Sequence, residues 1–229
     1  MLFAHCSLLI ALCSSLLDRL NLHVKIQIAQ VSRGDSFLRV ISGKCKGKKL
    51  FTLEGLSLRP TSDRVREAIF DILQKFSPGE KVLDLFAGTG ALGIEALSRG
   101  AQRAVFVEGT ARSGAVLRRN IEACRLTGQA ELVSKEVQAG LKALEERGDS
   151  FDLIFLDPPY GKGLAYRTLR ALSRSSLIAP DTLIVAEHSP GEDLSSVPSL
   201  ERIDWRKYGR TEVSFFRLKK IKLDTDEHR

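Results

Sequence analysis

The chain has 229 residues and a formal net charge of +7, with 43% hydrophobic and 28% charged residues. Its length allows one full domain with a small addition, and its composition is ordinary for a soluble globular enzyme. The four cysteines are widely spaced without a C-x-x-C pattern, and there are only four histidines, so we expect no structural zinc site. Such cysteines are typical of reduced thiols, so we expect a cytoplasmic protein that holds no metal. The basic excess indicates a polyanionic partner, most simply nucleic acid.

Residues 1–36 are expected to be an extension outside the main domain. Residues 8–13 form an apolar run similar to the core of a signal peptide, but residues 1–7 contain no lysine or arginine. The run is interrupted by Ser14, Ser15 and Asp18, and it is too short to cross a membrane. Two interpretations are favoured, a short additional helix or a start codon placed too far upstream, and an export signal is the weaker alternative. We expect no membrane partner.

The segment from residue 37 to residue 60 is expected to be a basic β-hairpin and a loop. Residues 37–42 and 48–51 flank a glycine-bounded turn at 43–47. Between residues 37 and 66 the chain has eight basic residues and only two acidic ones, Glu54 and Asp63. A solvated face is the alternative, but this local excess favours a surface that holds a nucleic-acid backbone. The candidate contacts are Lys44, Lys46, Lys48, Lys49, Arg59, Arg64 and Arg66.

The pattern of residues 61–220 predicts one α/β domain, and residues 221–229 are expected to form a polar tail. Thr61 or Ser62 can cap a first helix that ends at the Ser-Pro-Gly of residues 77–79. Strands are then expected at 82–86, 104–108, 131–134, 151–156 and 182–187, alternating with helices at 92–99, 111–126, 137–147 and 165–173. This alternation predicts a doubly wound, mostly parallel sheet. Residues 201–206 and 212–218 have no helix between them and predict an antiparallel hairpin at the edge of the sheet.

A short acidic and aromatic motif follows the fourth predicted strand. Asp157 is succeeded by Pro158 and Pro159, which stop the strand because proline has no backbone N–H, and then by Tyr160. The carboxyl end of a strand in an open α/β sheet is where ligands bind. The carboxylate and the proline carbonyl offer acceptors, and the tyrosine offers a ring face, which suits an amino group on a flat ring. These four residues are the candidate catalytic residues; a capped Pro-Pro loop is the simpler alternative.

The first predicted strand ends in a glycine-rich turn that can cradle a cofactor. Its glycines permit a sharp turn and a close approach of the backbone to a ligand, and the helix that follows points its N–H groups there. Residues 88–93 also match the dinucleotide pattern G-x-G-x-x-G, so this motif alone leaves an NAD-dependent oxidoreductase open. The candidate cofactor contacts in this segment are Asp84, Phe86, Ala87, Gly88, Thr89 and Gly90.

Acidic residues recur at the ends of four successive predicted strands and should line one edge of the sheet. Glu108 can accept hydrogen bonds from ribose hydroxyls, Glu136 from an adenine amino group, and Asp84 can approach a cationic amino-acid group. Asp157 is the fourth. A lining of this kind suits S-adenosylmethionine, which carries a sulfonium and an ammonium but no phosphate, and it disfavours a pyrophosphate. A surface residue at the start of the next helix is the alternative for Glu136.

With these motifs the chain resembles the class I S-adenosylmethionine-dependent methyltransferases that act on exocyclic amines, and among them the bacterial small-subunit ribosomal RNA guanine-N2 methyltransferases (the RsmD family). The resemblance covers about residues 38–218. It rests on the basic hairpin, on Leu58-Arg59-Pro60-Thr61 with the charged stretch after it, on the glycine-rich turn, and on Asp157-Pro158-Pro159-Tyr160. The family usually has Asp where this chain has Glu136, so a longer side chain must reach the adenine.

The resemblance implies a Rossmann-like, seven-stranded sheet that closes with the antiparallel hairpin. It also implies methylation of the N2 amine of one guanine in 16S ribosomal RNA, within a partly assembled small subunit, by a protein that we expect to be a monomer. Asp157 and the carbonyl of Pro158 would accept the two amine hydrogens, Tyr160 would stack on the base, and S-adenosylmethionine would supply the methyl group. A methyltransferase of DNA adenine or cytosine, a protein glutamine methylase and a non-catalytic RNA-binding assembly factor are the alternatives.

Overall fold

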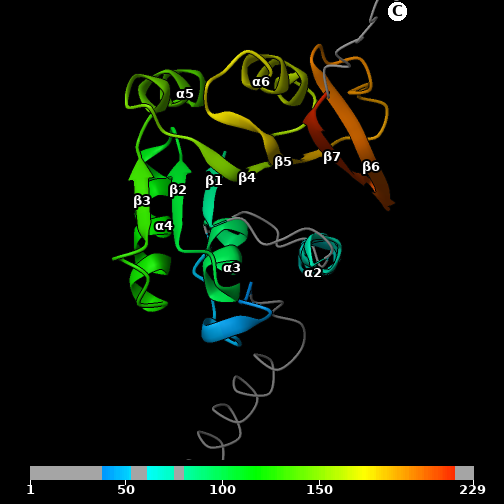
Figure 1. Cartoon of the computed structure of the whole chain (residues 1–229). Helices are drawn as coiled ribbons and strands as arrows, with labels where there is room; N and C mark the ends of the chain where they lie inside the picture. The colour runs from blue at the N-terminus through cyan, green and yellow to red at the C-terminus, as the bar shows by residue number, and fades with distance from the viewer. Residues whose placement is uncertain (1–37, 53–60, 75–79, 220–229) are drawn as a thin grey trace, which may run out of the picture. The chain divides into compact units, whose positions relative to one another are not determined.

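The computed structural model describes residues 38–52, 61–74 and 80–219, and it contains one seven-stranded sheet in the order β3-β2-β1-β4-β5-β7-β6 (Figure 1). The predicted extension at residues 1–36 and the tail at 221–229 lie outside the described residues, so these two boundaries stay predictions. Within the described part of the chain, no helix is both long enough and apolar enough to span a bilayer.

Five strands form the parallel part of the sheet, as the alternation of apolar runs predicts. Their bounds are β1 Lys81–Leu85, β2 Arg103–Val107, β3 Ala130–Val133, β4 Phe151–Leu156 and β5 Ile178–His188. β1 lies between β2 and β4 and pairs with both in parallel. The strand order therefore reverses between β1 and β4, and in open α/β sheets a crevice opens outside the carboxyl ends of the strands at such a point.

Helices cover both faces of the sheet, which is why its strands are apolar on both sides. The helices are α2 Thr61–Leu73, α3 Ala91–Arg99, α4 Ala111–Ala123, α5 Val137–Glu146 and α6 Leu164–Leu172. α2, α3 and α4 lie on one face, and α5 and α6 on the other (Figure 1). Successive residues of β1 point to opposite faces of the sheet, since Val82 packs in the apolar cluster of one face and Leu83 in that of the other.

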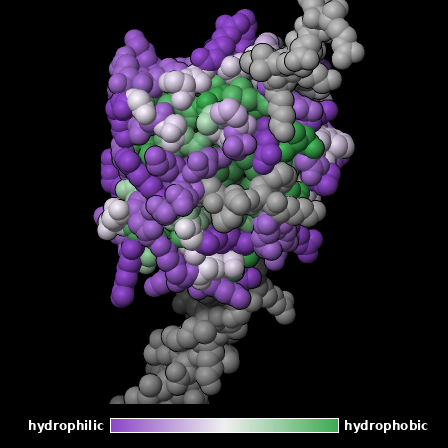
Figure 2. Space-filling view, viewed as in Figure 1, coloured by the Kyte–Doolittle hydropathy of each residue, from purple (hydrophilic) through white to green (hydrophobic). Residues whose placement is uncertain are grey.

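Hydrophilic residues cover most of the face of the molecule that Figure 2 shows.

The predicted antiparallel hairpin is confirmed at the edge of the sheet. β6 Leu200–Tyr208 pairs with β7 Thr211–Leu218, and β7 pairs antiparallel with β5. The chain reverses at Gly209, whose φ of +61° favours glycine. β7 is almost wholly buried, whereas most side chains of β6, the last strand in the order of the described sheet, are exposed.

The basic segment before the domain pairs as predicted, but over a shorter length. Arg39 and Lys49 form a single antiparallel bridge, and the 3₁₀ helix η1 Gly43–Cys45 occupies the turn. Buried side chains of α3 hold this segment in place. The carboxylate of Glu95 accepts hydrogen bonds from the backbone N–H groups of Ile41 (2.7 Å) and Ser42 (3.0 Å). The segment is therefore fastened to α3 through its own backbone.

Candidate active site

A cleft of about 870 Å³ opens at the carboxyl edge of the parallel strands. The segments after β1, β2, β3, β4 and β5 contribute to it, together with α2 and the paired ends of the basic segment. Its lining includes Leu38, Thr52, Arg66, Phe86, Gly88, Thr89, Glu108, Glu136, Asp157, Pro158, Pro159, Tyr160, Lys162 and Glu187. The structure thus brings most of the predicted cofactor and catalytic residues together in one cavity.

The glycine-rich turn after β1 forms one wall of this cleft in a strained conformation. Phe86, Gly88 and Gly90 all have positive φ, of +60°, +55° and +79°. Glycine adopts a positive φ readily, but a residue with a side chain, such as Phe86, rarely does. Backbone strain of this kind is found mostly at functional sites. The N–H of Gly90 donates to the carbonyl of Ala87 at 2.7 Å and closes the turn directly before α3.

Two side chains from other segments fix the shape of that turn. Glu108, just after β2, accepts the N–H of Gly88 at 2.9 Å with one oxygen and the N–H and hydroxyl of Thr110 with the other. Asn120 of α4 donates to the carbonyl of Thr89 at 2.9 Å. The same amide also exchanges two hydrogen bonds with the backbone of Phe51. Asn120 therefore joins the basic segment to the glycine-rich turn.

Asp84 is placed differently from the other acidic residues, because it lies beneath the turn and does not line the cleft. Its side chain is 2% exposed, and its carboxylate accepts the N–H of Gly93 at 2.9 Å. Burial raises the pKa of Asp84 to about 7, and the charge of Glu108 adds to this rise. A Cβ on Gly93 would lie 2.3 Å from the ring of Phe106, so only glycine permits this contact of helix and strand.

The acidic character of the cleft fits a cofactor that has positive charge and several hydrogen-bond donors. Glu108, Glu136 and Asp157 reach it from three successive strand ends. The carboxylate of Glu136 lies close to Gly109, where an added Cβ would be only 2.5 Å from Oε1. Glu136 is the residue before α5, and its side chain makes no capping hydrogen bond to that helix. A pyrophosphate would meet three carboxylates here, whereas S-adenosylmethionine has hydrogens to give them.

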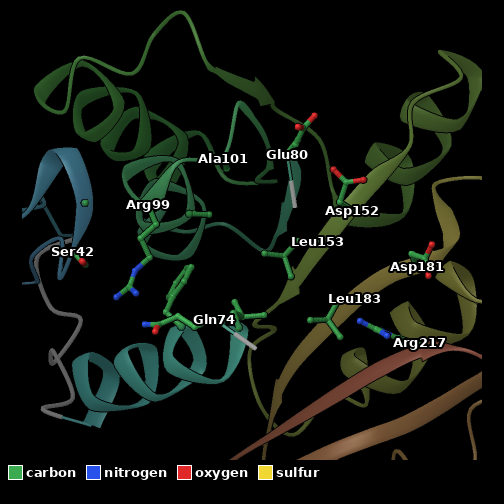
Figure 3. A pocket seen from close by; sticks show the side chains of 14 residues that line it. Ser42, Gln74, Glu80, Arg99, Ala101, Asp152, Leu153, Asp181, Leu183 and Arg217 are labelled. Carbon is green, nitrogen blue, oxygen red and sulfur yellow. The ribbon is translucent and has the colours of Figure 1, made fainter. Parts of the chain in front are cut away.

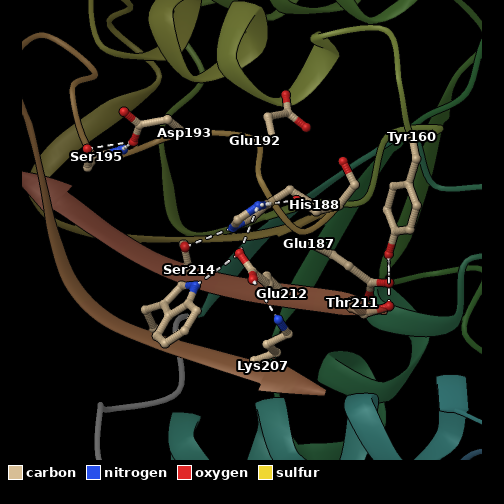
Figure 4. A network of polar contacts seen from close by, with 12 residues as sticks. Tyr160, Glu187, His188, Glu192, Asp193, Ser195, Lys207, Thr211, Glu212 and Ser214 are labelled. Atoms are coloured by element: carbon tan, nitrogen blue, oxygen red, sulfur yellow. Dashed lines mark hydrogen bonds and ion pairs between the residues drawn. The ribbon is translucent and has the colours of Figure 1, made fainter. Parts of the chain in front are cut away.

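The other end of the cleft holds the Asp157 to Tyr160 turn. Asp157 and Pro159 are exposed, Pro158 is buried, and Tyr160 is half-buried. The hydroxyl of Tyr160 donates to Glu187 at 2.8 Å and lies 2.9 Å from Oγ1 of Thr211 (Figure 4). Burial raises the pKa of Tyr160, and the nearby charge of Glu187 raises it further. The phenol therefore stays protonated and serves as a donor.

The contacts to Glu187, Thr211 and Asn120 were missed in the sequence analysis. Glu187 lies near the carboxyl end of β5, as the other acidic residues lie at the ends of their strands. The pattern of acids at strand ends could therefore have identified it. Thr211 begins β7 and reaches Tyr160 only through the antiparallel pairing of β7 with β5. Asn120 is wholly buried in α4, and no local pattern distinguishes it from a helical surface residue.

The predicted RNA-binding residues lie in different parts of the structure. Lys44, Lys46 and Lys48 are exposed, but they lie near the amino ends of the parallel strands, whereas the cleft lies at the carboxyl ends. Lys44 donates to Gln129, which directly precedes β3, and the next residue of η1 donates its backbone N–H to Ser98 near the carboxyl end of α3. Lys49 and Arg64 are also exposed. Arg59 lies outside the described residues.

Arg66 is the predicted RNA contact whose surroundings differ most from an open surface. Only 4% of it is exposed, and it donates to the carbonyl of Arg39 at 2.5 Å and to Asp63 at 3.1 Å. Burial lowers its pKa, while Asp63 acts in the opposite direction. Arg66 therefore ties α2 to the basic segment and forms part of the cleft wall, and its role toward RNA stays a prediction.

A second cavity, of about 830 Å³, lies at the amino ends of the strands (Figure 3). Phe70 and Leu73 of α2 line one side, with Arg99 held 4.7 Å above the Phe70 ring. Asp152, Leu183 and Arg217 line the other side. This cavity lies on the face of the sheet that α2 and α3 cover, because Leu153 and Leu183 pack in the apolar cluster of that face. No cluster of His, Cys, Asp and Glu able to hold a metal ion occurs among residues 38–52, 61–74 and 80–219.

Comparisons with known proteins agree with this arrangement. The family model described as conserved hypothetical protein 95 matches residues 38–217. The Bacillus subtilis protein YlbH is 36% identical over 181 residues, which cover 79% of this chain and 98% of that protein. Ribosomal RNA small subunit methyltransferase D of Escherichia coli is 34% identical over 166 residues, which cover 72% of this chain and 82% of that protein.

A solved structure shows the same fold. The Escherichia coli protein yhhF is 32% identical and has a TM-score of 0.70, over 79% of this chain and 97% of its own. The match of a family model to most of the chain and the identity to YlbH point to one conclusion. The chain belongs to the family described as conserved hypothetical protein 95, the RsmD family of methyltransferases.

Proposed function

We propose that this protein transfers a methyl group from S-adenosylmethionine to the exocyclic N2 amine of a guanine in 16S ribosomal RNA, during assembly of the small ribosomal subunit. The observation that carries the proposal is the single cleft in which Asp157, Pro158 and Tyr160 share a cavity with the glycine-rich turn, Glu108 and Glu136. The name of the Escherichia coli relative, a small-subunit ribosomal RNA methyltransferase, supports the choice of substrate.

The chain's own residues can hold the cofactor at one end of the cleft. S-adenosylmethionine, when bound, supplies an electrophilic methyl group on its sulfonium. The glycine-rich turn from Phe86 to Gly90 brings backbone to the cleft wall, and Glu108 is positioned to accept from ribose hydroxyls. Glu136 supplies a further acceptor for the adenine amino group. Asp84 supports this wall from below through its bond to Gly93.

The Asp157 to Tyr160 turn can orient the amine at the other end. The nitrogen of a guanine N2 amine is a poor nucleophile because its lone pair is delocalised into the ring. Asp157 and the carbonyl of Pro158 would accept its two hydrogens, so that the lone pair is directed away from the ring plane. Holding the reacting atoms in this way supplies much of the rate gain. Pro159 keeps the turn rigid, because its φ is fixed by the ring.

Tyr160 can hold the target base after it leaves its stack. A base stacked on an aromatic side chain gains about 1–3 kcal/mol, which offsets part of the few kcal/mol that unstacking costs. The two contacts of the hydroxyl, to Glu187 and Thr211, restrict the ring to one orientation beside Asp157. The cost is lower if the target guanine lies in an RNA loop, where bases are already accessible.

The experiment that tests the proposal uses small subunits from cells that lack this enzyme, with radiolabelled S-adenosylmethionine and nucleoside analysis of the product. We expect label in N2-methylguanosine from particles treated with wild-type protein. Parallel reactions with naked 16S ribosomal RNA, DNA and bulk protein test the other substrates. Label only in DNA or protein would refute the RNA target, and measured cofactor binding without any transfer would favour a non-catalytic assembly factor.

A further inference from the structure

The end of the edge hairpin lies directly beside the proposed base-binding turn. Thr211 begins β7, and its hydroxyl is 2.9 Å from that of Tyr160. Thr211 pairs with Tyr208, the last residue of β6, across the turn that contains Gly209 and Arg210. Lys162, two residues after Tyr160, also lines the cleft. Residues 205–211 and Lys162 are referred to below as the hairpin end.

The hairpin end has the composition of a nucleic-acid contact. Residues 205–211 contain Arg206, Lys207 and Arg210 and no acidic residue, whereas the other half of β6 contains Glu201 and Asp204. Trp205, the only tryptophan of the chain, is 42% exposed, which is unusual for a large apolar ring. Exposed aromatic rings among cations are the combination that binds single-stranded RNA, through base stacking and phosphate contacts.

Among the described residues, two of the four cations of the hairpin end have an acidic partner and two do not. Arg206 pairs with Asp204 at 2.5 Å, and Lys207 lies 3.9 Å from Glu212. Lys162 and Arg210 are exposed and form no ion pair within the described part of the chain. Their charges are therefore available to phosphates on either side of the Asp157 to Tyr160 turn.

The position of the hairpin end contrasts with that of the predicted basic surface. The exposed lysines around η1 lie at the opposite edge of the sheet, with α3 between them and the cleft. A nucleotide whose base enters the cleft must place its own phosphates near the cleft mouth. Lys162 lines the cleft there, and Arg210 directly precedes Thr211, which contacts Tyr160.

We propose that the hairpin end is a second RNA-docking surface, which binds the nucleotides that flank the target guanine. Lys162 and Arg210 would hold their phosphates, and Trp205 would stack on an unpaired base. This inference rests on the proposed function, since it assumes that the substrate is RNA. The competing explanation is that charges on an exposed edge strand only prevent sheets from pairing edge to edge.

The test compares the double variant K162E/R210E with the control double variant R170E/R174E, which makes the same change in net charge. Arg170 and Arg174 are also exposed, but they lie in the last turn of α6 and between α6 and β5, at the end of the sheet opposite the cleft. The Kd for 16S ribosomal RNA is measured at several salt concentrations, and the thermal midpoint and the Kd for S-adenosylmethionine are measured as checks of folding. Removing one cation that binds a phosphate reduces the slope of log K against log salt by about 1.

We expect the double variant to bind RNA at least tenfold more weakly, with a slope reduced by about 2, while the control binds as the wild type does. The W205A variant should bind about tenfold more weakly with an unchanged slope, since stacking involves no counterion. Equal binding by the double variant, the control and the wild type would overturn the inference. Failure of the wild type to methylate RNA would instead overturn the proposed function, so the two results are distinguishable.

Discussion

The hydroxyl of Tyr160 donates a 2.8 Å hydrogen bond to the carboxylate of Glu187 at the end of β5. The same oxygen lies 2.9 Å from the hydroxyl of Thr211, at the start of β7. One tyrosine of the Pro-Pro turn is thereby tied to two strands of the sheet. The neighbouring residue His188 is also engaged, since its Nε2 lies 2.9 Å from the hydroxyl of Ser214 (Figure 4). The turn is thus held by the antiparallel edge of the sheet.

Two substitutions of Tyr160 separate the ring from its hydroxyl. Y160F keeps the stacking face but removes both hydrogen bonds, so we expect a decrease in kcat of a few-fold, at about 1 kcal/mol for a hydrogen bond. Y160A also removes the ring, and we expect a further loss of about 1–3 kcal/mol in transition-state stabilisation. Steady-state methyl transfer measures both effects. E187Q is the control, because it keeps a partner for the hydroxyl and should resemble the wild type more closely than Y160F does.

Substitution of Asp157 tests the orientation of the amine. D157A should retain cofactor binding, because the glycine-rich turn, Glu108 and Glu136 are unchanged. Turnover should fall by about 10²–10³-fold, the usual effect of removing one positioned hydrogen-bonding group from an active site. Calorimetry with S-adenosylmethionine and single-turnover methyl transfer separate the two quantities. Undiminished turnover in D157A would refute the role assigned to this carboxylate. The turnover of D157N should lie between those of D157A and the wild type, because its amide oxygen still accepts a hydrogen bond.

Asp84 makes the stability of the free protein depend on pH. Its pKa of about 7 in the folded protein lies above the ordinary value of 3.8, so the folded state favours the protonated form. Its contribution to stability is therefore complete below about pH 4 and is lost as the pH rises through about 7. D84N does not titrate at this position, so it does not lose this contribution. As the pH rises from about 4 to about 7, the free energy of unfolding of D84N minus that of the wild type should therefore increase by up to about 4 kcal/mol.

Denaturant unfolding of D84N and wild type at several pH values measures this difference. Other titrating groups, such as His188 whose pKa is lowered by burial, are shared by both proteins and cancel in the comparison. A difference that does not change with pH would show that Asp84 stays ionised in the folded protein. D152N is the matched control, because Asp152 is exposed and, within the described part of the chain, accepts only the N–H of Lys81.

Asn120 should support both the basic segment and the cofactor turn. N120A leaves the backbone groups of Phe51 and the carbonyl of Thr89 without their partner, so we expect a loss of about 2–4 kcal/mol in the free energy of unfolding. Affinity for S-adenosylmethionine should also fall, because Thr89 belongs to the glycine-rich turn. Chemical denaturation and calorimetry test the two effects. N120D keeps the acceptor for Phe51 but not the donor for Thr89, so it should bind cofactor no better than N120A does.

Much of the fold follows from local patterns in the chain. Apolar runs of strand length alternate with helical segments, and each predicted strand of the parallel part agrees with an observed one to within a few residues. The edge hairpin is also confirmed, since β6 and β7 pair antiparallel. The basic segment is shorter in its pairing than predicted, because η1 and the contacts to α3 take up backbone groups that a longer ladder would use.

The sequence by itself determined the acidic edge of the cleft. Parallel strands all end at one edge, so acids at successive strand ends had to come together, and Glu108, Glu136 and Asp157 do so. The two prolines ended β4 because they cannot donate to a ladder. These conclusions need only the direction of each strand, which local patterns supply.

The tertiary structure alone decided which distant residues complete the site. Tyr160 meets Thr211 across 51 positions of sequence, and Asn120 meets Thr89 across 31. Asp84 lies under the turn and Lys44 at the opposite edge because of how α3 packs on the sheet. A local pattern gives the face on which a residue lies within its own element. The approach of two elements depends on the packing of the whole core, which no short segment encodes.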